Sequence, residues 1–277
     1  MKGIYGACIA NNITEIVGVM SGDCSNTEVL VEVLELEGIK VYPFLYPHSH
    51  KLEDVKIEIN KFMELFNVNL VQVEKIRQKL NRVRKLSKKI DEMTYIDNKV
   101  SGFENHLYQI ILSDLNGDID KCEIELMEKI NEIQKRKAKK EKLRLAYIGV
   151  PPMTDDIYDF VRKFDSHFVY NEVQREFAFP RGIEAKNIYE QYWNYTYPYN
   201  SKFRIQELKN QIEERKIDAV IHYTQAFCYR AVQDILIKKN LDIPVLNIEG
   251  DKINKLDART KLRLEAFLDM LGDRKNS

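Results

Sequence analysis

Short apolar runs that alternate with helical patterns constrain the fold of this chain more than any other feature. Near the N-terminus, residues 15–20 form an apolar run that stops before Gly22 and Asp23, which predicts a buried strand. A helical pattern continues to Gly38, and residues 39–44 predict a second strand. A strand, a helix and a strand with short connections form a βαβ unit, so we expect a parallel sheet.

The same alternation returns in the last part of the chain. It predicts strands at 143–150, 166–170, 217–223 and 244–248, and helices at 157–161, 202–215 and 258–271. Neither the Gly-rich dinucleotide fingerprint nor a phosphate loop accompanies these strands, so a nicotinamide or nucleotide site is not supported. We therefore predict the α/β class, with two Rossmann-like parallel-sheet domains and a helical middle section.

The pattern divides the chain into three sections. Residues 1–50 are expected to form the N-terminal part of a first α/β domain, and 143–277 a second Rossmann-like domain. Residues 51–142 are a helical section that completes or links the first domain. This section ends in a basic run at 135–140, which we expect to be a solvated helix end or linker.

Charge and composition exclude several classes of protein. The 277 residues include 43 basic and 43 acidic side chains, and this balance disfavours a nucleic-acid binder or a polybasic membrane-surface protein. No run approaches the ~18 apolar residues of a membrane helix, and no signal peptide is visible, so we expect a cytoplasmic location. In a reducing compartment the four cysteines are better explained as thiols, metal ligands or catalytic groups than as disulfides.

Two cysteines occupy equivalent positions in the two α/β sections. Cys24 precedes Ile39 by fifteen residues, and Cys228 precedes Ile243 by the same interval. Each is therefore expected just beyond the carboxyl end of a parallel strand, where open α/β sheets bind ligands and where a helix start favours the thiolate. Cys8 could join them in a cleft between the domains.

The trio Cys8, Cys24 and Cys228 leaves two interpretations open. Three thiolates are an odd set for structural zinc, which takes four ligands, but they suit an iron–sulfur cluster with one open iron. Because no CxxC run is present, isolated buried thiols are the alternative. Cys122 falls on the apolar stripe of a predicted helix, so we expect it to be a core thiol.

Short blocks around the cysteines and toward the C-terminus carry a family resemblance. They are GDCSNT at 22–27, LEG at 36–38, YPF at 42–44, FC at 227–228, IPVL at 243–246, EGD at 249–251, DART at 257–260 and RLEAF at 263–267. Together they resemble the 2-hydroxyacyl-CoA dehydratase and benzoyl-CoA reductase family, in particular the 2-hydroxyglutaryl-CoA dehydratase D-component. The similarity spans nearly the whole chain.

The resemblance implies a cofactor and a reaction. Position by position, Cys8, Cys24 and Cys228 would bind a [4Fe-4S] cluster. In the dehydratases the open iron takes the thioester carbonyl of an acyl-CoA substrate. An ATP-dependent activator protein then donates one electron, and the resulting ketyl radical loses water. A related branch carries a double-cubane cluster and reduces small molecules.

The resemblance also implies partners. We expect a homodimer or a heterodimer with a related subunit, acting as a lyase or as an ATP-dependent reductase component. The alternative is a non-catalytic iron–sulfur subunit for electron transfer or partner binding. Family members usually have a substantial stretch before the first ligand cysteine, whereas Cys8 is near the start here, so we expect a short, compact member.

Two other residues are candidates for direct roles. His222, in the strand before Cys228, could supply a proton or hydrogen bond to a substrate, or it is a satisfied core histidine. Arg175 could pair with a phosphate of a CoA-like ligand, or with Glu172 or Glu176.

Three further groups have weaker signals. His48 and His50 could bind metal, but we expect surface histidines. Glu249 and Asp251 would bond to a cluster-bound ligand or the activator, or Asp251 caps a helix. The aromatic stretch at 192–199 is expected in the core or at an interface.

Overall fold

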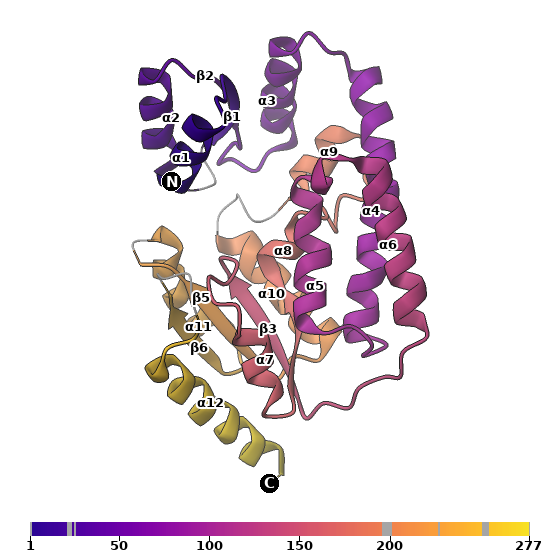
Figure 1. The fold of residues 1–277 in the computed structure, drawn as a ribbon, viewed down its shortest axis with the longest axis vertical. Coiled ribbons are helices and arrows are strands. Elements are labelled where there is room, and N and C mark those ends of the chain that lie inside the picture. The colour runs from indigo at the N-terminus through magenta and orange to yellow at the C-terminus, as the bar shows by residue number, and fades with distance from the viewer. Residues whose placement is uncertain are drawn as a thin grey trace.

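Two sheets organise the molecule, and every strand pairing in the described part of it is parallel. The computed structural model describes residues 2–20, 24, 26–195, 201–226, 228–250 and 255–276, apart from the side chains of Tyr229 and Asn276 (Figure 1). The mixed α/β class with parallel sheets confirms the predicted fold class. Among the described helices, none combines the length and apolarity needed to cross a membrane.

The smaller sheet belongs to residues 2–45, which we call the N-terminal unit. It contains α1 (Lys2–Ala10), β1 (Glu15–Met20), α2 (Asn26–Leu36) and β2 (Lys40–Leu45). β1 and β2 pair in register from Glu15↔Lys40 to Met20↔Leu45. Gly38, at a φ of +80°, ends α2 in a conformation that glycine adopts without strain.

The larger sheet has the strand order β4-β3-β5-β6. Its strands are β3 (Leu143–Gly149), β4 (Ser166–Asn171), β5 (Ala219–Thr224) and β6 (Val245–Glu249), each close to its predicted position. The connecting helices are α7 (Ile157–Arg162), α8 (Glu172–Glu176), α9 (Ile188–Trp193), α10 (Ser201–Arg215), the 3-10 turn η3 (Tyr229–Gln233), α11 (Asp234–Asn240) and α12 (Ala258–Asn276).

Both faces of the larger sheet are covered, and every residue of β4 and β5 is buried. One face packs against α7 and α12 through residues such as Tyr147, Phe168 and Leu264. The other packs against α10 and α11 through residues such as Leu208 and Ile237. Burial on both faces explains why the strands appear in the sequence as nearly unbroken apolar runs.

The middle section is helical, as predicted. It contains α3 (Leu52–Leu65), α4 (Leu70–Tyr95), α5 (Gly102–Ile110), the short turns η1 (Ile111–Ser113) and η2 (Leu115–Gly117), and α6 (Ile119–Gln134). Capping boxes at Asn69 and Ser101 start α4 and α5. The basic run at 135–140 follows α6 as a mainly exposed linker, which confirms that prediction.

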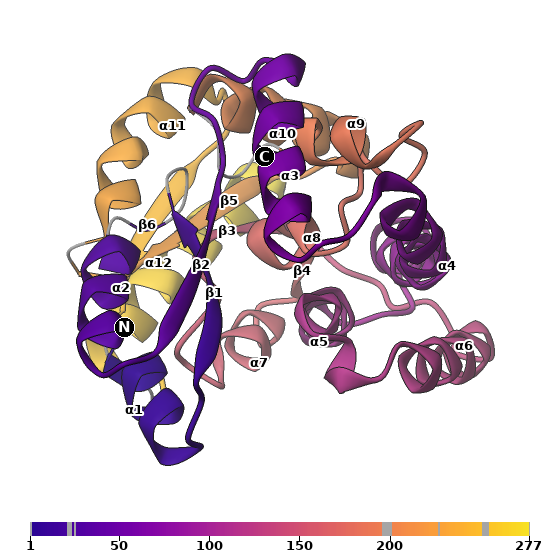
Figure 2. The same cartoon turned by 90° about the horizontal axis from the view of Figure 1, so that it is seen from above.

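The helices of the middle section lie beside the larger sheet. Figure 2 shows α4, α5 and α6 grouped beyond β4, and α5 contacts both β4 and α8. Gly102 at the start of α5 allows this close approach, because a Cβ there would lie 2.8 Å from Phe168 Cβ. Of these helices, α3 contacts β2 of the N-terminal unit.

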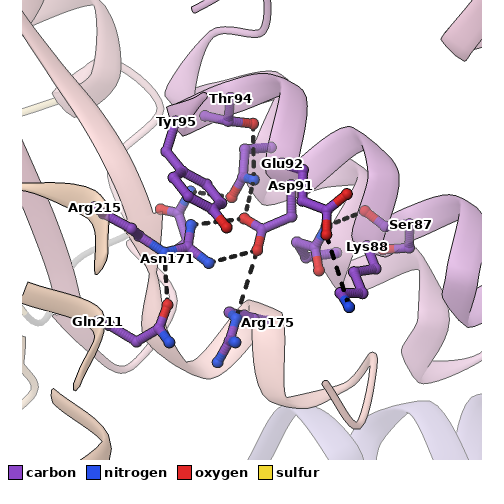
Figure 3. A network of polar contacts seen from close by, with 12 residues as sticks. Ser87, Lys88, Asp91, Glu92, Thr94, Tyr95, Asn171, Arg175, Gln211 and Arg215 are labelled. Carbon is purple, nitrogen blue, oxygen red and sulfur yellow. Dashed lines mark hydrogen bonds and ion pairs between the residues drawn. The ribbon is translucent and has the colours of Figure 1, made fainter. Parts of the chain in front are cut away.

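A buried charge network joins α4 to the larger sheet (Figure 3). Asp91 accepts hydrogen bonds from Arg215 at 2.5 and 2.9 Å and from Asn105 at 2.8 Å, and Arg175 lies 3.5 Å away. Burial opposes ionisation of Asp91, but the Arg215 charge and hydrogen bonds outweigh it and lower the pKa of this carboxyl. The network therefore holds an ionised carboxylate between α4, α8 and α10.

An aromatic cluster connects the N-terminal unit to the rest of the chain. Phe44 of the unit and Tyr46, which directly follows it, pack against Tyr192, Trp193 and nearby apolar side chains of α3 and α9. This confirms the core role expected for the first part of the 192–199 stretch; residues 196–199 lie outside the described residues. Figure 1 shows the N-terminal unit beyond the end of the larger sheet at which β3 and β5 terminate.

Candidate functional site at the strand ends

Cys24 and Cys228 lie at equivalent corners of the two sheets. Cys24 follows β1 and precedes α2, whereas Cys228 follows β5 and directly precedes η3. Each cysteine carbonyl accepts a hydrogen bond of 2.9 Å from the N–H three residues later, at Thr27 and Ala231 respectively. Both side chains are partly exposed. The two thiols therefore share the strand-to-helix position at which parallel sheets bind ligands.

Cys8 has a different environment. It lies in α1, is 7% exposed, and packs against Leu30, Leu34 and Ile39 in the core of the N-terminal unit. Across the described residues, no three His, Cys, Asp or Glu side chains are close enough to hold a metal ion. This arrangement does not bring Cys8, Cys24 and Cys228 together as a ligand set, so their common cluster stays a prediction.

Cys122 is a core thiol, as predicted. It is 1% exposed and packs with Leu126 and Ile130 of α6. Burial raises the pKa of its thiol to about 11, so it is protonated at neutral pH.

His222 points its two ring nitrogens into different surroundings. The ring is fully buried in β5, and Nδ1 lies 3.1 Å from Asp234 Oδ1 at the start of α11. Nε2 is buried and has no hydrogen-bond partner among the described residues. Burial, followed by the charge of Arg204, lowers the pKa of His222. When neutral His222 donates its Nδ1–H to Asp234, Nε2 is left as a hydrogen-bond acceptor without a donor among the described residues. Only one of its two ring nitrogens is therefore hydrogen-bonded, unlike in the expected satisfied core histidine.

A buried ion pair beside His222 was not predicted from the sequence. Both oxygens of Glu172 accept hydrogen bonds from Arg204, at 2.6 and 2.7 Å, and Oε2 also accepts the Gly149 N–H at 2.8 Å. Burial opposes ionisation of Glu172, but the charge and hydrogen bonds of Arg204 lower its pKa. Because Glu172 directly follows β4, the sequence indicates that it lies at the carboxyl edge of the larger sheet. The sequence does not indicate that its partner is Arg204, thirty-two residues away.

The ion pair continues to the turn that carries Cys228. Arg204 donates to Gln233 at 2.6 Å, and the buried Arg230 donates to the same amide oxygen at 3.3 Å. Both Arg230 and Gln233 belong to η3, which begins directly after Cys228. Glu172 and Arg204 therefore fix the turn that positions the Cys228 thiol.

Gly149 makes this corner possible. Its φ is +96°, and a Cβ there would lie 2.1 Å from the carbonyl oxygen of Tyr223. Because glycine has no side chain, Gly149 lets β3 end this close to β5 while its N–H donates a hydrogen bond to Glu172.

Arg175 pairs with carboxylates of the chain, but mostly not with the expected ones. It contacts Glu207 at 2.8 Å and Asp91 at 3.5 Å, and Glu176 at 4.0 Å, whereas Glu172 pairs with Arg204. Its charge is therefore compensated inside the protein, which disfavours a phosphate role. Of the two expected partners, Glu176 is confirmed, whereas Glu172 pairs with Arg204 instead.

The remaining candidates divide between surface and core. His48 is exposed, as expected. His50 is half-buried rather than exposed, because it lies against Phe203 and Trp193, with ring centroids 3.7 and 5.6 Å away. Glu249 is exposed at the end of β6, and Asp251 lies outside the described residues.

Taken together, the fold and this corner define a parallel α/β protein with thiols at the strand ends. A family model for the 2-hydroxyglutaryl-CoA dehydratase D-component matches residues 1–271. The chain therefore belongs to this family, which confirms the resemblance seen in the sequence. No protein of curated function matches it.

Proposed function

We propose that this chain is a catalytic component of a 2-hydroxyacyl-CoA dehydratase, with its reaction centre at the carboxyl ends of β1 and β5. The observation that carries the proposal is the matched placement of Cys24 and Cys228, partly exposed and at equivalent corners of a chain that belongs to this family. Thiolates at such corners are suited to hold an iron–sulfur cluster.

The proposed cofactor is a [4Fe-4S] or double-cubane cluster, with Cys24 and Cys228 as two of its ligands. When bound, it would supply one-electron chemistry at a thioester carbonyl. Cys8, the third proposed ligand, does not fit in the present arrangement, because its thiol is packed in the apolar core under α1. Its participation requires an arrangement of α1 different from this one.

The residues around Cys228 have roles of their own in this proposal. Glu172 and Arg204 hold η3 in place, as the hydrogen bonds to Gln233 indicate. His222 is neutral at pH 7 and offers Nε2 as an acceptor, so it can orient a substrate hydroxyl by accepting a hydrogen bond from it.

The test is the iron and sulfide content of the protein purified without oxygen. We expect bound iron in the native chain, most of it lost in Cys24→Ala and in Cys228→Ala. The matched control is Cys122→Ala, which removes a thiol from a core and should retain the iron. Iron-free native protein, or equal iron in all variants, would contradict the proposal. If Cys8→Ala retains its iron while Cys24→Ala and Cys228→Ala lose theirs, Cys8 is not a ligand of the cluster.

The proposed partners follow from the same assignment. We propose a homodimer or a heterodimer with a related subunit, and an ATP-dependent activator protein as electron donor. Addition of a 2-hydroxyacyl-CoA to the reduced, iron-loaded protein should change its visible spectrum if the chain is catalytic. An unchanged spectrum, together with reduction by the activator, would instead identify a non-catalytic electron-transfer subunit.

A further inference from the structure

An apolar groove lies between the N-terminal unit and the helices, and neither Cys24 nor Cys228 is among its lining residues. Its larger part is a pocket of about 420 Å³, bounded by β1, β2, α3, α4 and α9. The twelve side chains around it are apolar or aromatic, and they include Val19, Phe44, Phe62 and Tyr192. A pocket of this size and composition accommodates a hydrocarbon chain.

The groove continues along α4 into a second, smaller part. This part has a volume of about 280 Å³ and shares four lining residues with the first, namely Val68, Val73, Ile188 and Tyr192. Beyond these shared residues, its lining mixes apolar, polar and cationic side chains, namely Ile76, Leu80, Gln72, Gln191, Arg77 and Arg84. The groove is thus apolar along most of its length and positively charged at one end.

Arg84 carries the charge that is not compensated. Its Nη1 donates to the neutral amide oxygens of Asn81 and Gln191 at 2.9 and 3.0 Å, and its guanidinium lies over Phe179. Within the described residues, no carboxylate lies within 4.0 Å of it. Burial, and then the charge of Arg77, lowers the pKa of Arg84 to about 10, despite an opposing effect of Tyr192. It nevertheless stays protonated at neutral pH.

The neighbouring cations on α4 are different. Arg77 pairs with Glu74 at 2.5 Å and donates to two carbonyl groups. Arg82 pairs with Glu123 at 3.3 Å, and Lys85 with Glu184 at 3.1 Å. A half-buried arginine without a carboxylate, at the end of an apolar groove, is complementary to an anionic head group with an apolar tail.

We propose that this groove binds an amphipathic carboxylate, a medium-chain fatty acid or an equivalent acyl anion, with the tail between β1, α3 and α4 and the carboxylate on Arg84. The apolar lining accounts for the tail and the uncompensated guanidinium for the head. The lining of this site contains neither cysteine, and the proposal does not depend on the proposed dehydratase function.

Calorimetric titration with decanoate, below its micelle concentration, tests this assignment. We expect one decanoate per chain, and weaker binding of decanol and of decyltrimethylammonium, because the first lacks the charge and the second reverses it. Loss of the charge-assisted hydrogen bond should weaken decanoate binding about tenfold or more in Arg84→Gln. Arg84→Lys should retain part of the affinity.

Two further variants make the result specific. Arg82→Gln removes a cation from the same helix outside the groove and should bind decanoate like the native chain. Val73→Trp should block the neck that joins the two parts and abolish binding, with circular dichroism to show that the variant is folded. Equal binding of decanol and decanoate, several ligands per chain, or an unchanged affinity in folded Arg84→Gln would overturn the proposal.

Discussion

The two sheets place a cysteine at the same kind of corner but support that corner in different ways. β5 is buried on both faces, and a chain of hydrogen bonds from Glu172 through Arg204 to Gln233 secures the turn after Cys228. β1 has exposed positions such as Val17, and the Cys24 carbonyl accepts a backbone hydrogen bond from the Thr27 N–H. Among the described residues, the motif is therefore supported by buried charges in the larger sheet, and by a backbone turn beside a partly exposed strand in the smaller one.

This contrast has a consequence for function. A corner held by buried charges keeps a ligand in a fixed position, whereas a corner held by a thin, two-stranded unit can adjust to a ligand. We infer that Cys228 is the fixed side of the proposed site and Cys24 the adjustable side. Five changes test the comparison, from the largest expected effect to the smallest.

Asp91→Ala should have the largest effect on the larger sheet. It leaves Arg215 and Arg175 buried without their shared carboxylate, which costs about 3–5 kcal/mol of unfolding free energy. Urea unfolding measures the loss. The control is Glu92→Ala, whose pair with Lys88 is exposed and contributes less than about 1 kcal/mol. Equal losses in the two variants would show that the network does not hold α4 to the sheet.

Glu172→Gln should loosen the Cys228 corner selectively. It removes the carboxylate from buried Arg204, and we expect a loss of about 2–4 kcal/mol together with several-fold faster labelling of Cys228 by a thiol reagent. The labelling rate of Cys24 should not change. If both thiols become reactive together, the two corners are not independently supported.

Gly149→Ala and Gly18→Ala compare a glycine from each sheet. Alanine at Gly149 meets the Tyr223 carbonyl and an unfavourable positive φ, so we expect a loss of about 3 kcal/mol. At Gly18 the new Cβ meets only methyl groups of Val31 and Val41 at 3.1 Å, and the loss should stay near 1 kcal/mol. Thermal unfolding of both variants gives the difference, and a larger loss at Gly18 would reverse the comparison.

Mild acid should weaken the larger sheet through His167 in β4. Burial, together with the charge of Arg144, lowers the pKa of His167 to about 4, below the unfolded value near 6.5. The unfolded state then binds the proton more tightly, so stability is full above pH 6.5 and falls as the pH drops toward 4. The loss is on the order of 1 kcal/mol at pH 5.5. His167→Gln should flatten this dependence, whereas a change at exposed His48 should leave it intact.

Val17→Thr should have the smallest effect. Val17 is 47% exposed on β1, so the added hydroxyl remains hydrated and the change should stay within about 0.5 kcal/mol. Val220→Thr makes the same change in fully buried β5 and should cost about 1–3 kcal/mol. Similar unfolding midpoints for the two variants would mean that the sheets are equally well packed.

Local patterns in the sequence predicted most of the elements. The strands of the larger sheet, the helices of the middle section and the terminal helix lie where the apolar periodicity placed them, because each pattern reflects burial of its own segment. The equivalent corners of Cys24 and Cys228 were also predictable, since strand, turn and helix follow one another directly in the chain. Cys122 was assigned to the core for the same reason.

The tertiary structure alone decided which distant side chains meet. Arg204 reaches Glu172 across thirty-two residues, and Arg215 reaches Asp91 across one hundred and twenty-four. Cys8 was placed with the ligands from its position near β1, yet α1 turns its thiol into an apolar core. The groove ending at Arg84 combines segments from β1 to α9. A sequence pattern records how each segment is buried, but the pairing of charges and the shape of a pocket depend on how the segments pack.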